Sequence, residues 1–532
     1  MKPLFSDVLS SYTGEWGNLQ AAHLLRRSIF GPTLDQIREV EALGMDAAVD
    51  LLLADTPLPD PPVNYLDEDD PRVPIGESWV DTRYPPDGSG VRERRKALDA
   101  WILGQLLNQG LSIREKMTLF WHNHFPVERD VVLDGKFLYR YNDLLRKNAL
   151  GNFKSLVEDI TLDPAMLVYL NGKDNTKDNP NENYARELLE LFTIGKGDFA
   201  GPGDYTTFTE EDVIAIAKVL TGWSGVERFS VDIDLVFSEF HSELHDNSTK
   251  RLSHRFDNIE ISAAGENEYK NLIDIIFQKE EVAAFICRKI YRWFINSEIT
   301  PTIESTIIQG MAQFLQANDF EIKPLMSMLL RSKLFNDPAQ HGAIIKNPMD
   351  FVFSVYNGLE VKMPDYEQGW YRAFRAMTHF MGLMQMSYFY PPSVAGWEAY
   401  YLQPQYYKQW INSATLRPRT EFTDKLSQNG FRFGAHLMQI DVLGYIEKFD
   451  NPSDAASLII SLAEVMYPRP LKPFQVDQLK NVLIPGLPDF EWTIEYETYR
   501  EDPMNEEIAL SVENRLRNLF QAMLSLPEFH TS

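Results

Sequence analysis

Apolar residues recur at intervals of three and four along most of this chain of 532 residues. This spacing places them on one face of an α-helix, because a helix completes a turn about every 3.6 residues. The helical spacing covers residues 18–54, 91–125, 137–170, 209–222, 266–335, 346–386 and 437–526. Alternation with a period of two, which is typical of a strand, occurs over Phe229, Val231, Ile233, Leu235 and Phe237. The sequence therefore predicts a mainly α protein, a large irregular multi-helix bundle with one small β-hairpin insertion.

The pattern divides the chain into four parts, which we expect to pack as one unit. An N-terminal helical lobe occupies residues 1–225 and contains a long loop at 55–90 that is rich in proline, aspartate and glycine. A β-hairpin with a polar loop follows at 226–262. A second helical lobe with an aromatic segment covers 263–430, and C-terminal helices cover 431–532. A loop as long as the first is usually functional, disordered or wrapped over a core.

The charge and cysteine content exclude several classes of protein. The chain has 77 acidic and 51 basic residues and a net charge of −26, so it would repel phosphate backbones, and we expect no nucleic-acid partner. Its one cysteine, Cys287, excludes an intrachain disulfide and a cysteine-based zinc site. No run of about eighteen apolar residues predicts a membrane span, and no export signal is visible. We expect a cytoplasmic protein as written, or a periplasmic or exported one if a signal was removed.

The stretch 179–195 is the most informative single segment for function. Pro180 suits the first turn of a helix and Gly195 suits its end, so the segment predicts one amphipathic helix of about four turns. The polar face of this helix carries Glu182, Asn183, Arg186, Glu187 and Glu190. Glu187 lies nearest the apolar edge, so it is expected to be the most buried of the five.

Two interpretations of this polar face stay open. In the first, Glu182, Arg186 and Glu190 form a solvated ladder of ion pairs spaced by four residues, which contributes little stability. In the second, Asn183, Glu187 and Glu190 line a polar cleft as metal ligands or as acid and base groups. Arg186 then holds their charge in place or binds an anionic ligand.

Five positions, two in a helix and three in a loop, add further candidates. His122 and His124 fall in the last turn of a helix before Pro126, and they point about 160° apart, so one ion cannot bind both within a helix. Each is either a structural histidine near a helix C-terminus or a metal ligand. His245, Asp246 and Lys250 lie in a polar loop, where side chains braced by a rigid scaffold often bind ligands. Simple solvent exposure is the alternative for this loop.

Five ordered motifs, at residues 115–125, 179–195, 209–223, 245–250 and 391–397, resemble the bacterial family catalogued as domain of unknown function 1800. The family has no established activity to transfer. Its members often carry an export signal and are often encoded beside proteins of another uncharacterised family, numbered 1501, which looks related to sulfatases and phosphatases. The resemblance thus implies a protein of the 1501 family as a partner. The family's usual glycine after the Lys250 element is Ser253 here, which changes the turn expected there.

The leading hypothesis is a metal-dependent enzyme, either a hydrolase or an oxidoreductase. Nitrogen and oxygen donors suit a divalent transition metal, namely zinc, manganese or iron. The predicted ligands are His122, His124, Asn183, Glu187, Glu190, His245 and Asp246. The bound ion would activate water or dioxygen, with Glu187 and Glu190 as catalytic carboxylates, and Arg186 and Lys250 would hold an anionic substrate group.

Two other functions stay open. A non-catalytic assembly or chaperone-like partner of a neighbouring protein would show buried Glu–Arg pairs and no vacant cleft. A metal-free acid/base enzyme acting on carbohydrates would place two carboxylates in an open groove beside the aromatic segment around Trp397. Core packing is the alternative role for those aromatic residues.

Overall fold

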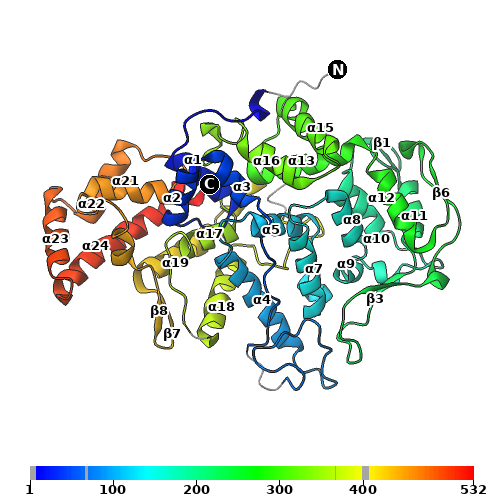
Figure 1. Ribbon diagram of the computed structural model, residues 1–532, viewed down its shortest axis with the longest axis horizontal. Helices are drawn as coiled ribbons and strands as arrows, with labels where there is room; N and C mark the ends of the chain where they lie inside the picture. The colour runs from blue at the N-terminus through cyan, green and yellow to red at the C-terminus, as the bar shows by residue number, and fades with distance from the viewer. Residues whose placement is uncertain (1–6, 66–69, 366, 398–405) are drawn as a thin grey trace.

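A computed structural model describes residues 7–65, 70–365, 367–397 and 406–532 and shows an elongated assembly of helices (Figure 1). The mainly α prediction is confirmed. Within the described residues the strands form four two-stranded antiparallel sheets, whereas the sequence predicted one hairpin. No described helix is both long enough and apolar enough to cross a membrane.

Helices occur throughout the described parts of the chain and are joined by connections of very different lengths. The first group is α1 (Asn18–Ser28), α2 (Leu34–Leu43), α3 (Met45–Leu52), α4 (Val91–Leu107), α5 (Arg114–His124), α6 (Arg129–Val132), α7 (Gly135–Lys147), α8 (Phe153–Thr161), α9 (Pro164–Tyr169) and α10 (Asn183–Glu187). The second group is α11 (Glu210–Val219), α12 (Glu268–Ile276), α13 (Glu280–Phe294), α14 (Pro301–Ile303), α15 (Gln309–Ala317), α16 (Ile322–Arg331), α17 (Pro348–Tyr356), α18 (Glu367–Leu383) and α19 (Leu416–Asp424). The last group is α20 (Val442–Ile446), α21 (Ala455–Met466), α22 (Pro473–Leu483), α23 (Phe490–Glu501) and α24 (Glu506–Ser525).

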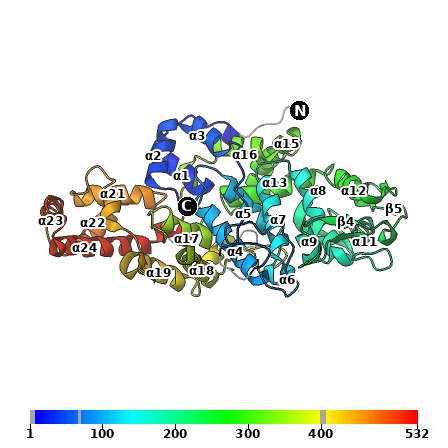
Figure 2. The same cartoon turned by 60° about the horizontal axis from the view of Figure 1, so that its bottom comes forward.

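The sheets are small hairpins at the periphery of the helices. They pair β1 (Phe199–Gly201) with β2 (Asp204–Tyr205), β3 (Trp223–Gly225) with β4 (Ser238–Phe240), β5 (Lys250–Arg251) with β6 (Glu260–Ile261), and β7 (Phe431–Phe433) with β8 (His436–Met438). A π-helix, Leu188–Thr193, directly continues α10. In Figures 1 and 2 helices α21 to α24 lie at one end of the molecule, and α11 and α12 lie at the other.

The alternating stretch predicted as a strand is the connection between two strands. Strands β3 and β4 pair from Trp223 with Phe240 to Gly225 with Ser238, so most of the alternating residues lie outside the ladder. Phe229 has a φ of +57°, which a strand does not allow, and its N–H donates to Asp134 Oδ2 at 2.8 Å. The side chain of Arg140 on α7 donates to the Val236 carbonyl. Side-chain hydrogen bonds therefore replace the strand pairing that the alternation suggested.

Helix α5 interlocks with the aromatic segment that ends at Trp397, although the two are distant in the sequence. Asn123 Oδ1 accepts a hydrogen bond from the Trp397 N–H at 2.8 Å, and His122 Nε2 accepts one from the Phe389 N–H at 3.2 Å. Gly396 lies against the same turn with a φ of +81°, and an added Cβ there would be 2.3 Å from the Asn123 carbonyl oxygen. Trp397 is fully buried, so the core-packing role is the one that the structure gives this segment.

Replacing Gly396 with alanine should break this interlock. The new Cβ would clash with the Asn123 main chain and would hold an L-residue at positive φ, so we expect Gly396→Ala to lower the free energy of unfolding by about 3 kcal/mol or more. Chemical denaturation followed by circular dichroism measures this. The control is Gly104→Ala, which adds a methyl group to helix α4 where no atom lies within 4 Å and should be neutral or slightly stabilising. Equal stability of the two variants would contradict the interlock.

Candidate functional site

His122 is a structural histidine in the core. Its Nδ1 lies 2.9 Å from the hydroxyl of Tyr141, and its Nε2 accepts from the Phe389 N–H, so both ring nitrogens are occupied by protein groups. The ring stacks on Tyr388 with a centroid distance of 4.7 Å. Complete burial lowers the pKa of His122 to about 3, which keeps the imidazole neutral.

His124 is also enclosed, but by different neighbours, as its position on the helix predicts. Its Nε2 donates to the Phe192 carbonyl at 3.0 Å, so its Nδ1 accepts from Lys289 Nζ, also at 3.0 Å. Lys289 donates in turn to the Leu191 carbonyl at 3.0 Å. Both carbonyls belong to the π-helix Leu188–Thr193. Burial lowers the pKa of Lys289 to about 7. The contact could not be predicted from the sequence, because Lys289 lies 165 residues after His124.

His245 and Lys250 meet at a buried carboxylate that the sequence analysis missed. Glu268 of α12 lies 3.1 Å from His245 Nε2 and 2.5 Å from Lys250 Nζ, and all three side chains are buried. His245 Nδ1 lies 2.9 Å from the Thr221 carbonyl oxygen. Asp246 does not join them, because its carboxylate accepts from the Ser248 N–H and hydroxyl within its own turn. These contacts fix the loop onto α12.

The helix that carries Glu187 begins later than predicted. Asn175 Oδ1 accepts from the Asn181 N–H at 2.8 Å and keeps the preceding residues out of the helix, so α10 starts at Asn183. Gly195 has a φ of +75° and follows the end of the π-helix, close to the predicted end. The apolar face is buried through Tyr184 and Leu188, as expected for an amphipathic helix.

The polar face of this helix contains one ion pair of the first interpretation, Glu182 with Arg186, whereas Glu190 pairs outside the predicted ladder. Arg186 contacts Glu210 at 2.7 and 2.9 Å and Glu182 at 3.2 Å, while Glu190 pairs with Lys196 at 3.3 Å. Glu187 is half-buried and makes no ion pair with the described residues. Burial, and then the nearby Glu190 charge, raise the pKa of Glu187 to about 7.

The predicted ligands therefore lie in three separate places. His122 and His124 are in the core around α5, His245 is at α12, and Asn183, Glu187 and Glu190 share the α10 region. In the part of the chain that the structure describes, no group of three or more histidine, cysteine, aspartate or glutamate side chains is arranged to hold a metal ion.

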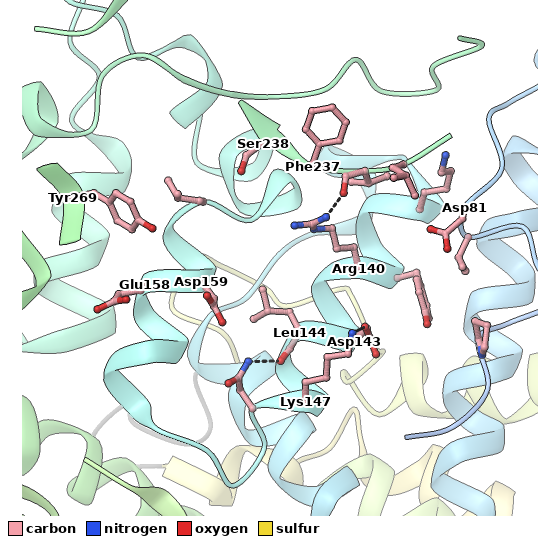
Figure 3. Close-up of a pocket in the computed structure, with 18 residues that line it drawn as sticks. Asp81, Arg140, Asp143, Leu144, Lys147, Glu158, Asp159, Phe237, Ser238 and Tyr269 are labelled. Carbon is pink, nitrogen blue, oxygen red and sulfur yellow. Dashed lines mark hydrogen bonds and ion pairs between the residues drawn. The ribbon is translucent and has the colours of Figure 1, made fainter. Parts of the chain in front are cut away.

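A cleft of about 880 Å³ lies beside α7 and α8, away from those residues (Figure 3). Two long irregular segments cover it, which are the loop after α3 and the connection between β3 and β4. The lining side chains are Pro61, Val80, Asp81, Lys136, Tyr139, Arg140, Asp143, Leu144, Lys147, Asn148, Glu158, Asp159, Leu162, Leu235, Val236, Phe237, Ser238 and Tyr269. The volume is typical of a ligand site, and the many charged side chains in the lining suit a polar ligand.

Charges of both signs face this cleft. Asp143 pairs with Lys147 one helical turn later, at 2.5 Å. Partial burial raises the pKa of Glu158 and of Asp159, which lie next to each other on α8. The α7 residues have the spacing of a helix face, which in a sequence indicates ordinary solvent exposure. The structure makes this face a cleft because the two irregular segments cover it.

The raised pKa of Glu187 predicts a pH dependence of stability. The folded pKa of about 7 lies above the ordinary value of 4.5, so this group's contribution is complete below about pH 4.5 and is lost as the pH rises through 7. Glu187→Gln should therefore match the wild type at pH 4 and exceed it at pH 8 by on the order of 1 kcal/mol, allowing for solvent screening. Denaturant titrations at both pH values measure this, with the exposed Glu211→Gln as a control. A pH-independent difference would contradict the assignment.

Comparison with known proteins identifies a family of unknown function. No curated protein and no solved structure matches the chain. A family model matches residues 23–531, which is nearly the whole chain. The chain therefore belongs to the family described as protein of unknown function, DUF1800.

Proposed function

We propose that this protein is an acid/base enzyme that binds a polar, hydroxyl-rich substrate such as a carbohydrate in the cleft beside α7 and α8. The observation that carries the proposal is that carboxylates from two different helices, Asp143 of α7 and Asp159 of α8, line one cleft together with Tyr139 and Tyr269. Carboxylates supply the acid and the base of many glycoside-cleaving enzymes, and tyrosine rings stack on sugar faces.

The surroundings of the two carboxylates differ in a way that suits two roles. Partial burial raises the pKa of Asp159, which favours the protonated form that a general acid requires. Asp143 is held in an ion pair with Lys147, which suits a carboxylate that acts as a base or a nucleophile. Arg140 donates to the Val236 carbonyl and so holds the covering segment over the substrate space.

The proposal predicts that both carboxylates are required for turnover. Asp143→Asn and Asp159→Asn should each lower kcat by about 10²- to 10⁴-fold on a substrate found by screening 4-nitrophenyl glycosides and polysaccharides. Their melting temperatures should match the wild type. The control is Glu239→Gln, which changes an exposed carboxylate on β4 outside the cleft. Full activity in either aspartate variant would reject this site.

A metal-dependent hydrolase or oxidoreductase with zinc, manganese or iron is a separate proposal. It now depends on Asn183, Glu187 and Glu190, the predicted ligands in the α10 region. Metal analysis of the same preparations by plasma mass spectrometry separates the two proposals. A stoichiometric metal that Glu187→Ala removes supports the α10 region, whereas the cleft proposal requires no such loss.

A second candidate function is assembly with another protein, and the exposed apolar side chains of the C-terminal helices favour it. These side chains lie on the end of the molecule formed by α21 to α24 (Figures 1 and 2). More than half of the side chain is exposed in Phe474, Phe490, Ile494, Met504 and Leu510. Exposed apolar side chains mark a protein interface where they form one contiguous patch, and Phe490 and Ile494 are neighbours on one helix. The resemblance to the family implies a protein of the 1501 family as the partner.

The assembly proposal predicts that charge on α23 prevents complex formation. Phe490 and Ile494 lie one helical turn apart, so Phe490→Asp and Ile494→Asp should each weaken binding to a co-expressed protein of the 1501 family by at least about tenfold. Size-exclusion chromatography and calorimetric titration measure this. Phe199→Asp, which changes an exposed phenylalanine on β1, should leave binding unchanged. Equal weakening by all three variants would contradict a specific interface.

A further inference from the structure

A buried group of basic side chains lies where α1, α5, α17 and α19 meet, and none of its members lines the cleft. We call it the basic chamber, and it consists of Arg26, Arg27, Lys116, Lys346 and Arg419, with the carboxylate of Asp350. The five basic side chains belong to residues that are between 0 and 6 % exposed. Long-chain cations are seldom buried to this extent unless an anion accompanies them.

The positive charges of the basic chamber outnumber its carboxylates. Lys116 forms an ion pair with Asp350. Within the described residues, the other four cations form no ion pair. Arg27, Lys346 and Arg419 are near enough to feel the charge of the same carboxylate. Among the described residues, Asp350 is thus the side-chain carboxylate that serves five buried cations, and burying the remaining charge is strongly unfavourable.

Several N–H groups of the chamber arginines also lack acceptors. One edge of each guanidinium is fixed by hydrogen bonds from Nη2. Arg26 donates to the Glu464 and Val465 carbonyls. Arg27 donates to the Gln340 carbonyl, and Arg419 donates to the Lys346 carbonyl. Within the described residues, no hydrogen-bond acceptor is found for Arg26 Nη1, Arg27 Nε, Arg27 Nη1 or Arg419 Nε. Buried donors without acceptors are rare and indicate a missing partner.

Arg146 shows that this fold can satisfy a buried arginine completely. It is as buried as the chamber arginines, and its donors reach Glu115 at 2.8 and 2.9 Å and Asn142 at 2.7 Å. Nε also lacks an acceptor in Arg94 and Arg129, but these two arginines form ion pairs with Asp70 and Asp99. Within the described residues, the chamber arginines form no ion pair.

A small cavity of about 10 Å³ lies beside three of the chamber cations, and Lys346 and Arg419 lie outside its lining. Its lining residues are Arg26, Arg27, Lys116, Trp293, Ile344, Ile345, Asn347, Asp350 and Ser532. A water molecule would fit this space and accept hydrogen bonds, but it would bring no negative charge. An oxyanion brings both acceptors and charge, and the planar guanidinium matches phosphate oxygens. The present space holds only a water-sized group, so binding of an oxyanion requires the Arg27 and Lys116 side chains to move apart.

We propose that the basic chamber binds a tetrahedral phosphate-type oxyanion, which supplies the missing acceptors and counter-charge. Burial lowers the pKa of Arg26, Arg27 and Arg419 to about 9 and holds the pKa of Lys346 well below its ordinary value. A bound anion opposes these shifts because it stabilises the charged forms. This site is separate from the cleft, so it stands whether or not the cleft is catalytic.

The first measurement is the melting temperature of the full chain in buffer free of phosphate and sulfate. Sodium phosphate should raise it by about 2 °C at a concentration 100 times the Kd, a size set by the length of the chain. Sodium chloride at the same ionic strength should not. An equal rise in both salts, or no rise at tens of millimolar phosphate, would overturn the proposal.

Variants separate a phosphate site from a structural role of the same cations. Lys346 Nζ makes no hydrogen bond or ion pair with the described residues and lies 4.2 Å from the centre of the Phe529 ring, so Lys346→Met loses no polar partner. Without phosphate, Lys346→Met and Arg27→Gln should melt at or above the wild-type temperature, and the rise with phosphate should be lost. Arg146→Gln should melt lower in both buffers but keep the rise. Retention of the full rise in both chamber variants would refute the site.

The source of the oxyanion is distinguished with phosphate esters. If inorganic phosphate raises the melting temperature and phenyl phosphate does not, the ligand is a free ion. If phenyl phosphate raises it equally, the ligand is the phosphoryl group of a larger molecule. Malachite-green analysis of acid-denatured wild-type protein shows whether phosphate co-purifies, and Lys346→Met should reduce its amount.

Discussion

The structure depends on a buried helix, α5, whose polar side chains connect segments that are far apart in the sequence. All of its residues after Arg114 are buried, although several carry charged or polar groups. Its partners are Arg146 for Glu115, Asp350 for Lys116, the Phe389 amide for His122, the Trp397 amide for Asn123, and the Phe192 carbonyl for His124. A buried polar group without a partner costs far more than a paired one gains, so each contact fixes the position of the segment that supplies it.

This arrangement explains which parts of the fold the sequence predicted. The helices follow from the spacing of apolar residues, because that spacing reflects burial on one face. Helix α2 begins after Thr33, whose hydroxyl accepts a hydrogen bond from the Gln36 N–H. The residues at the start of this helix therefore determine where it begins. The strand prediction failed because Phe229 and Val236 bind side chains of the first lobe, and such long-range contacts leave no periodic signal.

The candidate site was harder to predict for the same reason. Histidines and acids within one motif indicate chemistry in a sequence, but His122 and His245 are satisfied by buried partners from other segments. Glu268 contacts His245 and Lys289 contacts His124, and nothing near either partner in the sequence identifies it. The cleft depends on the covering of α7 by two irregular segments, and the basic chamber depends on helices separated by hundreds of residues. A spatial site of that kind requires the fold before it can be seen.

The two polar regions differ most in how their charges are balanced. In the cleft, acids and bases alternate on neighbouring walls and remain accessible to water, so its charges are stable without a ligand. In the basic chamber the cations are buried and their excess charge opposes the close packing of the helices around them. Arg26 nevertheless donates to the Glu464 and Val465 carbonyls at 2.7 and 2.9 Å, which joins α1 to α21. Any group that neutralises the chamber therefore strengthens the contact between the N-terminal helices and the C-terminal end of the molecule.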